Sequence, residues 1–387
     1  MKTNHKIIFN NAMDMEGVLS ESVDLMVTSP PYPMIEMWDE MFGRQNASVK
    51  KALVKGDGPK AFELMHQMLD PVWEEVYRVL KVGGLACINI GDATRTINKH
   101  FALYPNHMRT LQAALGLGFS ALPCILWRKQ TNAPNKFMGS GMLPAGAYVT
   151  LEHEYILILR KGPKREFKKD EDKRIRRESA VFWEERNSWF SDVWFDVKGT
   201  PQALDNKNAR SRSAAYPFEV AYRLINMYSA KGDTVLDPFL GTGTTTAAAV
   251  ASGRNSIGYE IDRSLENVID RIKDVIVDSS RQIIRKRLTK HIEFVVQRLK
   301  TKGSFKYDNL HYGFPVMTAQ EKELLLNDAL QIMKEENGCF EVKYSAQPQP
   351  EFCKNWSAEL REHNLSAVGQ KLHHFLSSKN SAQMTLF

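Results

Sequence analysis

The chain of 387 residues is poor in cysteine, and its four cysteines form no metal-binding pattern. No two of them lie in a CxxC pair, and no spacing of cysteine and histidine suggests zinc. So few cysteines in so long a chain are typical of a reducing cytosol. The N-terminus lacks the apolar core of a signal peptide, and no run of about 18 apolar residues could span a membrane. We therefore expect a cytoplasmic protein that uses no metal and no membrane anchor.

The amino-acid composition does not favour a disordered chain, and it shows no excess of acidic residues. Hydrophobic residues make up 43% of the chain, which is enough for a packed core. The length suits one large domain or two smaller ones. The formal net charge of +7 is compatible with a polyanionic partner but does not establish one.

Short apolar runs alternate with segments of helical spacing along most of the chain. This alternation predicts an α/β fold with a mostly parallel sheet. Beyond about residue 264 the chain reads as mostly helical and basic, and residues 130–147 read as a loop. The expected strands are 6–9, 23–28, 85–90, 125–127, 155–159, 234–236 and 256–259, and the expected helices are 61–80, 105–116, 217–228 and 244–251.

A glycine-rich turn, DPFLGTG at 237–243, joins an expected strand to an expected helix. Glycines at such a turn let the backbone approach a ligand at the helix N-terminus. Glu260 ends the next strand, nineteen residues after Gly241, where an acid can accept hydrogen bonds from ribose hydroxyls. No lysine follows Gly243, which excludes a P-loop, and Thr246 replaces the third glycine of a dinucleotide fingerprint. The turn therefore predicts a nucleoside-containing cofactor other than NAD.

The sequence Ser29-Pro30-Pro31-Tyr32 follows the strand expected at 23–28. A base amine is a poor nucleophile because its lone pair is delocalised, and acceptors around it favour the pyramidal geometry of attack. The Ser29 side chain and the Pro30 carbonyl could supply such acceptors, since proline rings restrict the local backbone. Tyr32 offers a flat face on which an extruded base could stack. The four residues are thus candidates for catalysis on a nucleobase.

Together, SPPY and DPFLGTGTT followed by GYEID resemble the motifs of the β-class DNA amino-methyltransferases of restriction-modification systems. The catalytic motif precedes the cofactor loop by about 210 residues, which is the β-class order. The resemblance implies a Rossmann-like methyltransferase fold and the cofactor S-adenosyl-L-methionine. One departure concerns Ser211-Arg212-Ser213, where the family often has a histidine. The cofactor-binding residues implied by the resemblance are Pro217, Phe218, Asp237, Phe239, Gly241, Gly243, Thr244 and Glu260.

The resemblance also implies the division of the chain and the reaction. The expected parts are a catalytic half at 1–159, a target-recognition region at 160–212, a cofactor half at 213–263 and a helical, basic extension at 264–387. Serine in the first motif position is commoner in enzymes that methylate the N4 amine of cytosine. The expected function is therefore site-specific methylation of cytosine N4 in double-stranded DNA by base flipping. The alternatives are the amine of adenine, RNA as substrate, and a non-catalytic DNA-binding subunit.

Two further features bear on partners. Residues 160–177 carry ten Lys or Arg against four Asp or Glu, and phosphate contacts are expected from Lys168, Lys169, Arg176 and Arg177. The apolar face of a helix at 281–302 should dock on the domain or on a second subunit, which would give a homodimer. A cognate restriction endonuclease acting separately is also expected. Cys124 follows a proline as in ring-carbon cytosine methyltransferases, but its apolar setting indicates a core residue.

Overall fold

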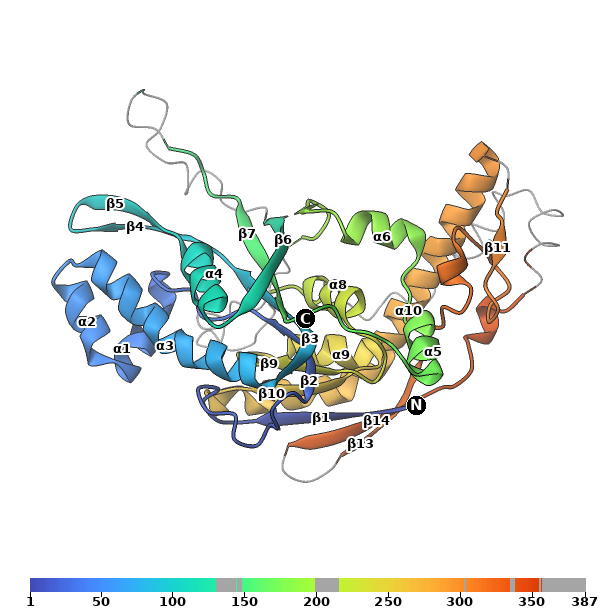
Figure 1. The fold of residues 1–387 in the computed structure, drawn as a ribbon, viewed down its shortest axis with the longest axis horizontal. Coiled ribbons are helices and arrows are strands. Elements are labelled where there is room, and N and C mark those ends of the chain that lie inside the picture. Colours follow the sequence, from blue (N-terminus) through green and yellow to red (C-terminus); the bar gives the residue numbers. More distant parts are fainter. Residues whose placement is uncertain are drawn as a thin grey trace.

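Ten strands form one continuous sheet in the computed structural model, which describes residues 1–129, 144, 148–198, 216–302, 304–334, 338–354 and 356 (Figure 1). The order across the sheet is β13-β14-β1-β10-β9-β2-β3-β7-β6-β8. In chain order these strands are β1 (Lys2–Ile8), β2 (Val23–Thr28), β3 (Leu80–Ile90), β6 (Phe119–Arg128), β7 (His153–Lys161), β8 (Val193–Trp194), β9 (Thr234–Asp237), β10 (Asn255–Tyr259), β13 (Ala329–Lys334) and β14 (Cys339–Tyr344).

The centre of the sheet is parallel, and the strands on either side join it through antiparallel pairs. The strands β1, β10, β9, β2 and β3 run in one direction. By contrast, β7 runs antiparallel to β3 and β6, and β14 runs antiparallel to β1 and β13. The predicted α/β class with a Rossmann-like sheet is therefore confirmed. In a parallel centre the carboxyl ends of all five strands meet at one edge, where ligands bind in open α/β sheets.

Helices cover both faces of this centre, which explains why β2 is buried along its whole length. Leu25 and Val27 pack toward one set of helices, whereas Met26 packs toward the other. This division follows from the two-residue side-chain period of a strand. The helices α1 (Asp39–Gln45), α2 (Ala47–Val54), α3 (Gly58–Val79) and α4 (Asn106–Gly116) belong to the first half of the chain, and α8 (Phe218–Tyr228) and α9 (Thr244–Ser252) follow later.

The C-terminal part begins as predicted and then departs from the prediction. Helix α10 (Glu266–Lys302) buries Ile284, Leu288 and Ile292 against later residues of the same chain, so its apolar face docks within the chain. The expectation of a helical extension is wrong after α10, because β11 (Tyr307–Asp308), β12 (Pro315–Val316), β13 and β14 follow. Residues in β14 alternate between partly exposed and buried, which is a strand period.

Several elements at the carboxyl edge of the sheet were not predicted. A hairpin of β4 (Ala93–Ile97) and β5 (His100–Tyr104) follows β3 directly and lies with α1 and α2 on the left of Figure 1. Its turn residues Asn98 and Lys99 both have positive φ, as the tightest hairpin turns require. Among the described residues, no helix has the length and apolar character needed to cross a bilayer. The loop predicted at 130–147 lies, apart from residue 144, outside the described residues.

Candidate active site

The catalytic motif and the glycine turn lie side by side although about 210 residues separate them. Strand β2 pairs directly with β9, so both carboxyl ends reach the same edge of the sheet. The Thr28 hydroxyl at the end of β2 donates to the carboxylate of Asp237 at the end of β9, over 2.6 Å. The half-buried Ser29 begins the loop that follows, and Pro30 and Pro31 are buried behind it. The structure thus brings together the two motifs that the sequence analysis linked only by resemblance.

The Tyr32 hydroxyl is the centre of a hydrogen-bonded cluster. It lies 3.0 Å from Ser29 Oγ, donates to Glu154 Oε2 over 2.9 Å, and accepts from Asn89 Nδ2 over 2.8 Å. Asn89 Nδ2 also donates to Glu154 Oε2 over 2.7 Å, and Lys129 Nζ donates to Glu154 Oε1 over 2.8 Å. Burial and the neighbouring Glu154 carboxylate raise the pKa of Tyr32 well above its ordinary value. The phenol therefore keeps its proton at neutral pH.

Three of these residues, Asn89, Lys129 and Glu154, were missed by the sequence analysis. Asn89 stands in the apolar run that forms β3, and Glu154 stands at the start of β7, which runs antiparallel to β3. The start of β7 therefore lies at the same edge as the ends of β2 and β3. A polar residue in a strand that is otherwise apolar was the available signal, but it required knowledge that β7 runs in reverse.

The loop that carries Tyr32 is fixed from behind. Asn106 donates through Nδ2 to the carbonyls of Pro33 and Gly91, over 3.0 and 2.9 Å. Met34, which follows Pro33, has a φ of 67°, a left-handed conformation that is unusual for methionine. A side chain at Gly91 would place its Cβ 3.0 Å from Tyr32 Cε2. The glycine therefore allows the Tyr32 ring to lie directly against the backbone that follows β3.

The glycine turn has the shape expected of a loop that holds a ligand. Gly241 and Gly243 have φ values of 56° and 87°, in the left-handed region that favours glycine. A Cβ at Gly241 would come no nearer than 4.0 Å to other protein atoms, so the space beside it is open. The Gly241 amide donates to Glu260 Oε2 and the Asp262 amide donates to Glu260 Oε1, each over 2.8 Å. An oriented carboxylate thus stands next to an open glycine turn, which fits a nucleoside cofactor with ribose hydroxyls.

Asp237 differs from the other residues predicted to hold the cofactor. It is 2% exposed, and its oxygens accept hydrogen bonds from Thr28, from Thr245 and from the Phe239 amide. Burial raises its pKa from 3.8 to about 6. Because Asp237 is almost fully buried, its contacts shape this loop and tie it to β2.

The remaining residues predicted to hold the cofactor surround the start of α8 and the glycine turn. Pro217 is the N-cap residue of α8, and the Phe218 ring stacks on Tyr222 with centroids 5.4 Å apart. Phe239 is half-buried within the turn, and Thr244 begins α9. Residues 211–213, where the sequence departs from the family pattern, lie outside the described residues.

The basic residues predicted to contact DNA lie away from this edge. Their segment includes Arg165, which forms ion pairs with Asp24 at the start of β2 and with Asp233 just before β9. The cation-π contacts of Arg165 and Arg176 with Phe167 place α5 (Asp170–Glu178) at the same, amino-terminal edge. Asp24 lies five residues before Ser29 along β2, which is about 17 Å at the usual rise per residue.

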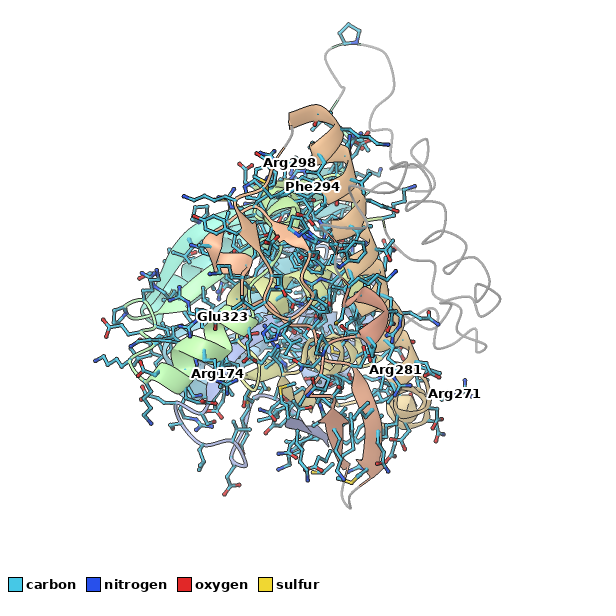
Figure 2. The ribbon with its side chains drawn as sticks, turned by 90° about the vertical axis from the view of Figure 1, so that its right-hand side faces the viewer. Arg174, Arg271, Arg281, Phe294, Arg298 and Glu323 are labelled. Atoms are coloured by element: carbon cyan, nitrogen blue, oxygen red, sulfur yellow. The ribbon has the colours of Figure 1, made fainter. Side chains whose placement is uncertain are left out.

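Two of these four basic residues pair with carboxylates of the same chain. Lys168 pairs with Glu166, and Arg177 donates to Glu323 over 2.8 Å. Lys169 is the exposed N-cap residue of α5. Figure 2 turns the right-hand side of Figure 1 toward the viewer and shows Arg174 of α5 on this side, with Glu323 above it. The structure does not bring these side chains to the catalytic motif.

In the rest of the predicted recognition region, β8 pairs with β6 in the sheet, whereas the helix before it packs on the C-terminal part. Helix α6 (Trp183–Trp189) supplies Glu185, which forms an ion pair with the buried Arg287 of α10. Residues 199–212 lie outside the described residues. Cys124 lies within β6 and packs against the hydrophobic core, in agreement with its interpretation as a core residue.

A parallel sheet whose carboxyl edge joins an open glycine turn to an SPPY motif is the arrangement of an amino-methyltransferase. Residues 23–271 match the model of the DNA methylase family, and the chain belongs to this family. The Type II methyltransferase M.MthZI of Methanothermobacter thermautotrophicus is 52% identical over 89% of this chain and 96% of its own length. The Type II methyltransferase M.MjaI of Methanocaldococcus jannaschii is 52% identical over 69% of this chain and 90% of its own.

A solved structure supports the fold and the identity of the cofactor. The protein TTHA0409 of Thermus thermophilus, solved in complex with S-adenosyl-L-methionine, is 29% identical to this chain. The similarity covers 70% of this chain and 96% of TTHA0409, with a TM-score of 0.55.

Proposed function

We propose that this DNA methyltransferase uses S-adenosyl-L-methionine to methylate the exocyclic N4 amine of cytosine in duplex DNA, with the target base flipped out of the helix. The observation that carries the proposal is the junction of Ser29-Pro30-Pro31-Tyr32 with the open glycine turn, made by the hydrogen bond from Thr28 to Asp237. Acceptors for a base amine and a site for a nucleoside cofactor thus share one edge of the sheet.

The chain's own residues would hold the cofactor and orient the base. Glu260 presents a carboxylate to the ribose hydroxyls, and Gly241 leaves room for the ligand beside the turn. The bound cofactor supplies a methyl group already activated by its positively charged sulfur. Ser29 Oγ and the Pro30 carbonyl accept hydrogen bonds from the target amine, and the Tyr32 ring stacks on the flipped base. Catalysis then depends mainly on alignment, which can supply about 7–11 kcal/mol in favourable cases.

The DNA should approach the carboxyl edge, where the base has to enter. The β4–β5 hairpin projects from this edge and exposes Lys99 and His100 at its tip. Two side chains of β5 also face solvent, with Phe101 37% and Leu103 52% exposed. A two-stranded ribbon fits the major groove of B-form DNA. We therefore include the hairpin in the proposed DNA face, in place of the basic segment at 160–177.

Serine in the first motif position supports cytosine rather than adenine as the target base. The test is base-resolved mapping of methylation in DNA from cells that express the protein. N4-methylcytosine at one recurring sequence is the expected result. Methylated adenine would overturn the choice of base but keep the enzyme class, and unmodified DNA would overturn the function itself. The cognate endonuclease and the homodimer stay predictions.

A further inference from the structure

We infer that Glu154 is a positioning residue for methyl transfer, because it sets the direction of the hydrogen bond between Tyr32 and Ser29. The inference rests on the proposed function and extends it to a side chain outside the catalytic motif. Glu154 does not touch the substrate in this scheme. It acts through the Tyr32 hydroxyl on the one side chain that accepts from the target amine.

The setting of Glu154 is that of a fixed, ionised carboxylate. The residue is 8% exposed, so its charge needs partners. Lys129 Nζ supplies the opposite charge at 2.8 Å from Oε1, while Asn89 Nδ2 and the Tyr32 hydroxyl both donate to Oε2. An ionised carboxylate only accepts hydrogen bonds. The proton between Glu154 and Tyr32 therefore belongs to the phenol.

This donation decides the other two contacts of the Tyr32 hydroxyl. A phenol has one proton, and here it points to Glu154. The oxygen can then only accept, and it has two partners that can donate, namely Asn89 Nδ2 at 2.8 Å and Ser29 Oγ at 3.0 Å. The Ser29 proton is thus directed at Tyr32.

The consequence concerns what Ser29 offers to a base. With its proton held by Tyr32, Ser29 Oγ turns its lone pairs away from Tyr32 and can accept from an amine N–H. Without Glu154, Tyr32 could donate to Ser29 instead, and Ser29 would then have to direct its own proton elsewhere. Glu154 therefore makes Ser29 an acceptor before the base arrives, which is the kind of preorganisation that lowers a reaction barrier.

Two substitutions interrupt the series of hydrogen bonds from Ser29 through Tyr32 to Glu154 at different points. Tyr32→Phe keeps the aromatic face for stacking but removes the hydroxyl. Glu154→Gln keeps the size of the side chain but presents an amide that can donate to Tyr32. Each should lower the single-turnover rate of methyl transfer on a cognate duplex by roughly 10- to 100-fold, as side chains that orient other functional groups commonly do. As a control, Glu75→Gln alters a carboxylate that forms an ion pair with Arg78 outside this cluster, and it should leave the rate unchanged.

The decisive measurement repeats both changes in a Ser29→Ala background. If Glu154 and Tyr32 act through the Ser29 hydroxyl, neither change lowers the rate further once that hydroxyl is gone. A merely structural role would lower the rate by the same factor in both backgrounds. Fluorescence of 2-aminopurine at the target position reports base flipping, and it should be the same for Glu154→Gln and wild type.

Separate outcomes overturn separate claims. A Glu154→Gln enzyme with the wild-type rate, or equal losses with and without Ser29, overturns the role of Glu154 alone. If Glu154→Gln fails to fold in a thermal unfolding assay, Tyr32→Phe takes its place. Its rates with and without the Ser29 hydroxyl then decide whether the series of hydrogen bonds acts through Ser29. A wild-type protein that methylates no base overturns the proposed function, and the inference with it.

Discussion

Substituting valine for Gly241 should abolish cofactor binding without unfolding the protein. Gly241 has a φ of 56°, and a Cβ there would meet no protein atom nearer than 4.0 Å. The new side chain therefore fills the open space beside the turn rather than the core. A left-handed conformation costs roughly 1–2 kcal/mol for a residue with a Cβ, so the free energy of unfolding should fall by about this amount.

The variant should lose more free energy of cofactor binding than free energy of unfolding. Forcing extra methyl groups into a filled space costs about 1–3 kcal/mol when the surroundings can yield. Here the ligand would be the neighbour that must yield, and 3 kcal/mol corresponds to about a hundredfold in affinity. Calorimetry with S-adenosyl-L-methionine should therefore show at least this decrease in the folded variant.

Gly232 offers a matched control for this substitution. It has a φ of 77°, and a Cβ there would also meet nothing within 4 Å, but it lies before β9 rather than after it. Gly232→Val should lose a similar amount of stability and keep its affinity for the cofactor. A folded Gly241→Val protein with wild-type affinity would refute the cofactor site. Equal losses of affinity in both variants would refute the argument from space.

Three other predictions follow from the same geometry. Ser29→Ala removes one of two acceptors for the target amine, so single-turnover methyl transfer should slow by about a hundred- to a thousandfold with unchanged cofactor affinity; a wild-type rate would remove the motif from the mechanism. Burial raises the pKa of Asp237 from 3.8 to about 6, so its stabilising contribution is full below about pH 4 and is lost as the pH rises through 6, by at most about 3 kcal/mol. Urea unfolding of Asp237→Asn should show a flatter dependence on pH between 4 and 6 than wild type does, and parallel curves would contradict the assigned cause. Replacing Lys99 and His100 by alanine should weaken DNA binding and reduce its salt dependence. Alanine substitutions at Lys168, Lys169, Arg176 and Arg177 should do neither. A larger loss of DNA affinity in this second set would instead support the DNA contacts predicted from the sequence.

The sequence was sufficient for the elements that carry the two motifs. Strand 23–28 was predicted at its observed bounds, because its mostly apolar residues run directly into Ser29-Pro30-Pro31, where two prolines end a strand. The strand before the glycine turn and the helix after it were placed to within one residue at their ends, since the turn itself marks both. The chemistry of Ser29 and the spacing of Glu260 from Gly241 are local features, and local features can be read from one sequence.

Only the tertiary structure could decide which distant segments meet. Strands β13 and β14 join the sheet beside β1, whose buried side chains Thr3 and His5 are polar and gave little sign of a strand. The direction of β7 brings Glu154 to Tyr32, although 122 residues separate them. The turn back along β7 likewise carries the basic segment at 160–177 to the amino-terminal edge. Composition alone cannot distinguish the two edges of a sheet, because the direction of each strand depends on pairing with strands remote in sequence.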